Sequence, residues 1–191
     1  MENDILPLEN DEPLFGQTKK FTLLIKNSIQ FREYNVRRRN ILTNNKTYLT
    51  TCRNNEKTDP YCPIFVLDDI VKRAGEDYDK IAKKGAVIAI YIKWNCNLDY
   101  NEEKCKPEYN FKRMDDPNAV VSNGLNYRYT DCFKDGSRTL YKAVGIRFIF
   151  LVDGKAGKFD FVPLVINIGS GLGLLAIVSV NFKNDKIIIK L

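Results

Sequence analysis

The sequence has 191 residues, of which 44% are hydrophobic and 12% aromatic, so its length and composition suit one folded domain and exclude a disordered chain. Histidine is absent, which excludes histidine-based catalytic triads, two-histidine zinc sites and imidazole acid–base chemistry. The formal net charge of +6 favours a polyanionic partner, which could be a nucleic acid, an acidic membrane surface or a nucleotide triphosphate.

The chain before residue 161 has the composition of a β-sheet protein. Residues 1–12 are acidic and lack a basic start and an apolar stretch, so they do not predict a secretory signal. Strand-forming residues predict strands, in chain order, at 21–31, 86–94 and 139–152. Between them we expect a basic turn at 36–40 (VRRRN) and a polar loop at 115–124.

Two short helical segments interrupt this pattern. Leu67, Ile70, Val71 and Ala74 recur at helical spacing, with acidic residues near the start of the segment and a glycine at its end. A second short helical turn is expected at 78–84. The sequence therefore predicts a mainly β fold with one or two short helices.

The five cysteines are spaced as two close pairs and one remainder. Cys52 with Cys62 and Cys96 with Cys105 suggest two hairpin-like disulfide staples, and Cys132 is left as an unpaired thiol. A zinc site would need tighter cysteine spacing or histidines. Disulfides require an oxidising compartment, and the sequon that begins at Asn45 agrees with an extracellular face and glycosylation there.

Residues 161–180 contain no charged side chain over 20 positions. At about 1.5 Å per residue, a helix of this length covers the ~30 Å hydrocarbon core of a membrane. Small and polar residues within such a span often line a pore or a helix contact. A buried core helix or strand pair of a soluble protein is the alternative interpretation.

Candidate ligand-binding residues lie on the predicted strands. Asn126 and Arg128 share one face of a strand and offer an amide and a guanidinium group to phosphate oxygens, and Lys142 adds a positive charge. On the first strand, Thr22, Leu24 and Lys26 share a face that combines a hydroxyl, an apolar surface and a positive charge, which could contact the base edge and ribose of a nucleotide. The segment 154–160 (GKAGKFD) lacks the spacing of a phosphate-binding loop and is expected to form a turn with two solvated lysines.

Together these features resemble the ionotropic, ATP-gated purinoceptor channels. The resemblance covers residues from about Pro7 to Val180 and rests on several motifs at once. They are FTLLIKN (21–27), RNIL (39–42), KTDPYCPIF (57–65), WNCNLD (94–99), NYR (126–128), RTLYKAVGIRF (138–148), GKAGKFD (154–160) and NIGSGL (167–172).

The resemblance implies a subunit of a non-selective cation channel in the plasma membrane, with its β-rich domain outside the cell. It implies a homotrimer or a heterotrimer with full-length subunits, surrounded by membrane lipid, in which extracellular ATP is the agonist and no cofactor or metal is needed. It assigns Thr22, Leu24, Asn126, Arg128 and Lys142 to ATP, makes 115–124 a mobile flap, pairs Cys52 with Cys62 and Cys96 with Cys105, and places Ile166, Asn167, Ser170 and Gly173 along the pore.

The same resemblance implies a division of the chain into an extended edge at 1–20, a β-rich extracellular domain at 21–160, a membrane helix at 161–180 and a divergent charged tail at 181–191. We expect the chain to supply only the carboxy-terminal half of a subunit, without the first membrane helix and the paired lysines that hold the triphosphate.

Other functions are less well supported by the sequence. A membrane-anchored β-rich module that binds nucleotide or protein, or a non-conducting regulatory fragment, is the main alternative. Nucleic-acid binding rests on net charge alone, because the lysines and arginines are scattered rather than gathered with aromatic residues. No nucleophile, base or metal set predicts an enzyme.

Overall fold

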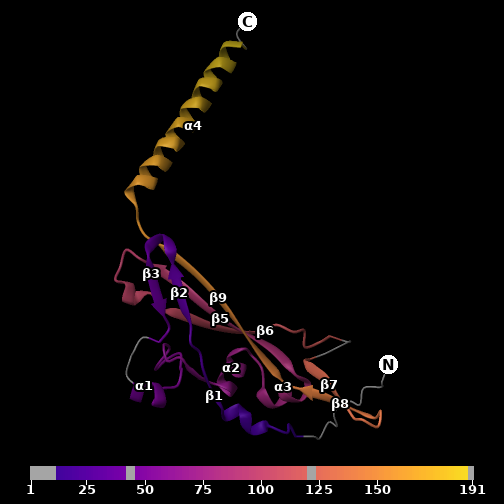
Figure 1. Ribbon diagram of the computed structural model, residues 1–191. Helices are drawn as coiled ribbons and strands as arrows, with labels where there is room; N and C mark the ends of the chain where they lie inside the picture. The colour runs from indigo at the N-terminus through magenta and orange to yellow at the C-terminus, as the bar shows by residue number, and fades with distance from the viewer. Residues whose placement is uncertain (1–11, 42–45, 120–123, 189–191) are drawn as a thin grey trace.

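The computed structural model describes residues 12–41, 46–119 and 124–188. It consists of a β-rich body and one long helix, α4, that extends away from it (Figure 1). The strands are β1 (Thr22–Leu24), β2 (Ser28–Phe31), β3 (Val36–Arg39), β4 (Ile64–Val66), β5 (Ala86–Asn97), β6 (Pro107–Arg113), β7 (Asn126–Cys132), β8 (Arg138–Val144) and β9 (Ile146–Gly157). The helices are α1 (Lys46–Thr51), α2 (Leu67–Arg73), α3 (Tyr78–Lys84) and α4 (Phe161–Ile188), with short 3₁₀ turns η1 (Gly16–Lys20), η2 (Arg32–Tyr34) and η3 (Glu102–Lys104).

The centre of the body is a three-stranded sheet in the order β6-β5-β9. Strand β5 pairs antiparallel with β6, and it pairs in parallel with β9 along all 12 of its residues. Alternate residues of β5, from Ile88 through Ile90 and Ile92 to Trp94, are buried, as expected for a strand whose one face forms a core. This pattern confirms the strand predicted at 86–94.

Helices α2 and α3 supply the other side of that core. Ile70 and Val71 of α2 and Ile81 of α3 join the buried residues of β5 in one hydrophobic cluster. The side chain of Asp77 caps α3 by accepting a hydrogen bond from the Lys80 backbone N–H at 3.0 Å. Both predicted helical segments are therefore present, and their apolar faces pack against the central sheet.

Three two-stranded sheets surround the centre: β1-β4, β2-β3 and β7-β8, all antiparallel. In Figure 1 the β2-β3 hairpin lies at the end of the body next to the start of α4, and the β7-β8 hairpin lies at the opposite end. Strand β9 leads from the region of β8 to the start of α4. A single continuous strand thus connects the two ends of the body.

Two disulfides staple this body. Cys52 pairs with Cys62 and Cys96 pairs with Cys105, with Cα–Cα separations of 6.0 and 4.8 Å. Cys132 is an exposed free thiol. The cysteine spacing therefore predicted the pairs and the remainder correctly.

Several predicted elements differ from the structure. The segment expected to be a basic turn at 36–40 contains strand β3, because exposed arginines are tolerated on the solvent side of a two-stranded hairpin. The strand expected at 21–31 is divided into β1 and β2 by residues 25–27. The strand expected at 139–152 is divided into β8 and β9 at Gly145, since glycine inside a strand pattern often marks such a break.

The segment 154–160 was also predicted wrongly as a turn. Strand β9 continues through Gly157 because its parallel pairing with β5 extends to Asn97. The two lysines of this segment, Lys155 and Lys158, are exposed as expected. Helix α1 and strands β4 and β6 were not predicted, since each lacks a strong local pattern.

Helix α4 contains a candidate membrane span. Phe161–Ser179 has a mean hydropathy of 2.2, and none of that window is buried inside the structure. Its exposed apolar side chains contradict a buried core helix, because such a helix would be covered by other elements. The helix continues without a break to Ile188.

Candidate ligand face and membrane helix

The predicted phosphate-binding residues lie together on the β7-β8 hairpin. The register places Arg128 directly opposite Lys142, and Asn126 opposite Val144. Because side chains alternate along a strand, Asn126, Arg128 and Lys142 share one face. The guanidinium of Arg128 and the ammonium of Lys142 both donate hydrogen bonds, so this face can meet the oxygens of an anion.

Aromatic residues form the other face of the same hairpin. Tyr129 and Tyr141 are opposite in register and stack with ring centroids 4.9 Å apart and an interplanar angle of 14°. Tyr127 lies two residues before Tyr129 on this side and is 53% exposed. Sequence reasoning did not single out these tyrosines, although their alternation with Asn126 and Arg128 in NYRY was the available signal.

A contact between two glycines fixes the base of this hairpin. Gly85 ends α3 and Gly124 precedes β7, and both have positive φ, 79° and 77°. A Cβ atom on either would overlap backbone atoms of the other segment, including Leu125 beside Gly85 and Lys84 beside Gly124. Only glycine fits both the conformation and the space, so the start of β7 is held directly against the start of β5.

The polar loop that follows β6 is anchored by Asp115. Its carboxylate accepts hydrogen bonds from the Val87 backbone N–H at 2.8 Å and from the Arg113 guanidinium at 2.6 Å. Burial by itself raises the pKa of Asp115, but the hydrogen bonds from Arg113 and Val87 and the Arg113 charge together hold this pKa below its ordinary value. Residues 120–123 of the expected flap lie outside the described residues.

The predicted nucleoside contacts lie elsewhere. Thr22 and Leu24 are on β1, which pairs with β4, and Leu24 is 54% exposed. Strand β1 and the β7-β8 hairpin belong to separate sheets, and helices α2 and α3 lie between them in Figure 1. One chain therefore does not bring Thr22 and Leu24 into the same pocket as Arg128 and Lys142.

The predicted pore residues form one stripe of α4. Ile166, Asn167, Ser170 and Gly173 are spaced by one, three or four positions, which places them on neighbouring parts of one helix face, and all are exposed. The Ser170 hydroxyl donates to the Asn167 carbonyl oxygen at 3.0 Å. This bond satisfies the hydroxyl within the helix.

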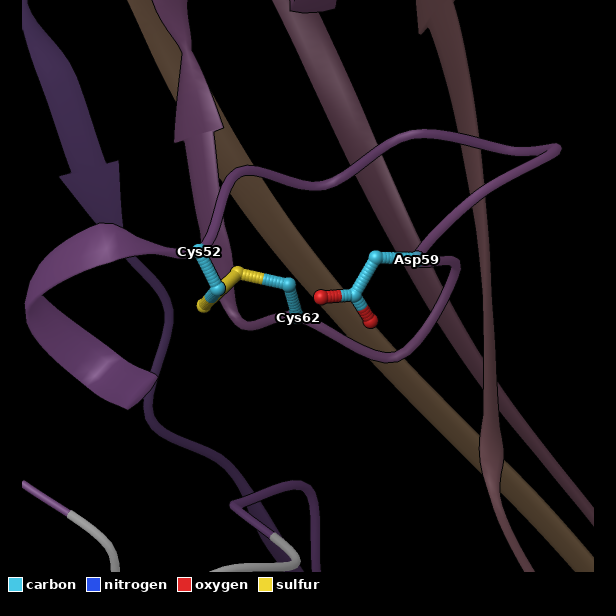
Figure 2. A group of neighbouring side chains, drawn as sticks. All are labelled: Cys52, Asp59 and Cys62. Atoms are coloured by element: carbon cyan, nitrogen blue, oxygen red, sulfur yellow. A yellow bond between two sulfur atoms is a disulfide. The ribbon is translucent and has the colours of Figure 1, made fainter. Parts of the chain in front are cut away.

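Cys52, Asp59 and Cys62 place three candidate metal-ligand atoms within 4.8 Å of one another. Figure 2 shows Cys52, Asp59 and Cys62 close together, with the two sulfurs joined as a disulfide. Disulfide sulfurs are not the thiolates that bind metals, and Asp59 accepts a hydrogen bond from the Tyr48 hydroxyl at 2.6 Å. Burial, followed by this hydrogen bond, raises the pKa of Tyr48 to about 12. The group is a structural staple and does not fit a metal.

The glycosylation prediction at Asn45 falls outside the described residues.

Comparison with known proteins identifies the family. Residues 2–190 match the family model described as ATP P2X receptor. The chain belongs to the P2X receptor family. It is 47% identical over 186 residues to P2X purinoceptor 4 of Bos taurus. This alignment covers 91% of this chain and 48% of the bovine protein. It is 47% identical over 170 residues to P2X purinoceptor 5 of Rattus norvegicus, covering 86% and 37% of the two chains.

Solved structures of P2X receptors have the same fold. An invertebrate P2X receptor from the Gulf Coast tick, determined in the presence of ATP and Zn²⁺, matches with a TM-score of 0.82 and 47% identity, over 94% of this chain and 53% of that one. The chicken ATP-gated P2X7 receptor channel, determined with the competitive antagonist TNP-ATP, matches with a TM-score of 0.71 and 39% identity, over 85% and 51%. The chain thus spans about half the length of the P2X relatives it matches.

Proposed function

We propose that this chain forms part of a subunit of an extracellular ATP-gated, non-selective cation channel. The observation that carries the proposal is the β7-β8 hairpin of a P2X family member, on which Asn126, Arg128 and Lys142 share one face. Guanidinium and ammonium groups side by side suit a triphosphate, because charge-assisted hydrogen bonds to phosphate are strong and the arginine can bind two oxygens at once.

The separation of the two predicted contact groups supports a site between subunits. Within one chain, Thr22 and Leu24 lie on a different sheet from Arg128 and Lys142. We infer that Thr22 and Leu24 contact the adenine and ribose region, and that the triphosphate meets the hairpin face of an adjoining subunit. A homotrimer, or a heterotrimer with full-length subunits, provides this arrangement around a symmetry axis.

Gating follows from the path of β9. ATP opens a channel only to the extent that it binds the open state more tightly than the closed state. Closure around the triphosphate displaces the β7-β8 hairpin, which is followed directly by β9 and then by α4. We infer that this movement shifts α4 and the stripe of Ile166, Asn167, Ser170 and Gly173 that lines the pore.

The same proposal assigns places to the parts of the chain. Residues 21–160 form the extracellular domain, preceded by an amino-terminal edge at 1–20 whose described part contains the η1 turn. The disulfides of this domain require an oxidising compartment. Residues 161–180 span the plasma membrane in contact with lipid, and 181–191 follow as a charged tail. ATP acts as agonist rather than as a cofactor, and we expect no enzymatic activity and no nucleic-acid partner.

The test is the ATP dependence of cation current in cells that express the receptor containing this chain. Lys142→Ala and Arg128→Ala are each expected to raise the ATP concentration for half-maximal current by more than about tenfold, the loss of one charge-assisted contact to phosphate. Lys134→Ala, an exposed charge beyond the end of β7, serves as the control. Unchanged responses in both site variants would contradict the proposal, and ATP binding without current would instead indicate a non-conducting binding module.

A further inference from the structure

A cleft lies at the open end of the β2-β3 hairpin, away from the β7-β8 face. It has a volume of about 540 Å³ and is lined by Lys26, Asn27, Ser28, Arg37, Arg39, Asn40 and Ile41. Small-molecule sites occupy roughly 300–1,000 Å³, so the cleft is large enough for a small ligand. None of its residues belongs to the face of Asn126, Arg128 and Lys142, and of the strand face that begins with Thr22 and Leu24 only Lys26 lines it.

The floor of the cleft is fixed by the buried Asn40 and the half-buried Asn27. Asn40 is 1% exposed; its Oδ1 accepts from the Asn27 backbone N–H at 2.8 Å, and its Nδ2 donates to the Ile25 carbonyl oxygen at 2.7 Å. Its Nδ2 also donates to the Tyr109 hydroxyl at 3.0 Å. The Asn27 Oδ1 accepts in turn from Trp94 Nε1 at 2.9 Å. These bonds fix the floor in one conformation before any ligand arrives, which lowers the entropic cost of binding.

The rim of the cleft carries three positive charges. Arg37 and Arg39 are two residues apart on β3, so their side chains lie on the same face, and Arg39 is opposite Ser28 in register. Lys26, Arg37 and Arg39 are all exposed. None of the three forms a salt bridge with an acidic residue of the described chain, whereas Arg113 pairs with Asp115 at 2.6 Å.

An unneutralised group of cations around a fixed polar floor favours a multivalent anion. Arginine guanidinium groups fit phosphate oxygens in a planar fork, and the Ser28 hydroxyl offers a further donor. One carboxylate would leave most of the charge of Lys26, Arg37 and Arg39 unbalanced, whereas linked phosphate groups balance more of it. We propose that this cleft is a second anion site, which binds a small ligand with at least two linked phosphate groups.

The test measures pyrophosphate binding by isothermal titration calorimetry to the full chain purified in detergent. The double variant Arg37→Gln/Arg39→Gln removes two charges from the rim and is expected to bind pyrophosphate about a hundredfold more weakly, roughly tenfold for each charge-assisted contact. Arg32→Gln, in η2 of the same hairpin but outside the cleft lining, removes one charge as the control and is expected to bind as the parent chain does.

Further variants keep the result decisive. Because the proposed nucleotide face also suits pyrophosphate, the arginine variants are compared in a Lys142→Ala background, where the loss caused by Arg37→Gln/Arg39→Gln is expected to be as large as in the parent chain. If the double variant fails to fold, as shown by circular dichroism, Arg37→Gln and Arg39→Gln alone give the same test with a loss of about tenfold each. Parent-like binding by the arginine variants, or disappearance of their effect in the Lys142→Ala background, would overturn the cleft assignment while leaving the channel proposal to its own test.

Discussion

Replacing Asn40 by alanine tests how strongly the buried asparagine network stabilises the body. The substitution leaves three former partners without Asn40: the Asn27 N–H, the Ile25 carbonyl and the Tyr109 hydroxyl. A buried polar group that loses its partner costs about 1–3 kcal/mol. The Tyr109 hydroxyl loses only one donor to its oxygen and keeps its own O–H free to donate, so most of the cost comes from the other two partners. We expect Asn40→Ala to lower the free energy of unfolding by roughly 2–5 kcal/mol.

That loss is large against the total stability of a domain, which is about 5–15 kcal/mol. A smaller change, Tyr109→Phe, removes only the hydroxyl that accepts from Asn40. We expect it to cost about 1 kcal/mol, the net value of one hydrogen bond. The order of the two effects follows from the number of partners that each substitution removes.

The assay is urea unfolding of the purified chain in detergent, followed by tryptophan fluorescence. Trp94 is the single tryptophan of the sequence, is 1% exposed, and bonds directly to Asn27, so its emission reports on this network. Asn110→Ala, at an exposed position of β6, is the matched control and should change stability by less than about 0.5 kcal/mol. If Asn40→Ala lowers stability no more than Asn110→Ala does, the reasoning is wrong.

Two further predictions concern packing and pH. Gly154→Ala places a Cβ into Ile29 Cδ1 and should lower the free energy of unfolding in urea by about 1–3 kcal/mol. Adding Ile29→Ala should recover part of the lost stability. Gly157→Ala, whose Cβ meets nothing within 4 Å, should not cause a comparable loss. Because the pKa of Asp115 is lowered in the folded chain, its contribution to stability is complete above its unfolded pKa and is lost as pH falls through the folded value. Asp115→Asn should flatten the fall of stability as pH drops below about 4, the ordinary carboxyl pKa, whereas Asp116→Asn should not, as urea midpoints measured through that range will show.

Local patterns in the sequence were sufficient for the elements that depend on local physics. Alternating apolar residues predicted β5, because one face of a strand that packs on a core must be apolar at every second position. Helical spacing predicted α2, and cysteine spacing predicted both disulfides, since a short loop keeps the two thiols near each other. The uncharged segment from Phe161 predicted helix α4, because about 20 apolar residues in a row are long enough for a helix to span a membrane.

The boundaries of the strands were harder to predict from the sequence. The run VRRR reads as a turn by composition, yet Val36–Arg39 is strand β3 because it pairs with β2 across the η2 turn. The break at Gly145 depends on β9 pairing with β5, which is distant in sequence. Strand pairing satisfies backbone hydrogen bonds between separate segments, and no local pattern states which segments meet.

For the candidate sites, strand alternation in the sequence was enough to place Asn126 and Arg128 on one face and Lys142 on a nearby strand. The position of Lys142 opposite Arg128, the location of Thr22 on another sheet, and the cleft that Arg37 and Arg39 border above Asn40 are visible only in the folded chain. Alternation along a strand is a property of neighbouring residues, so it can be predicted locally. Register and buried hydrogen bonds join residues far apart in the chain, and they form only when the whole body packs.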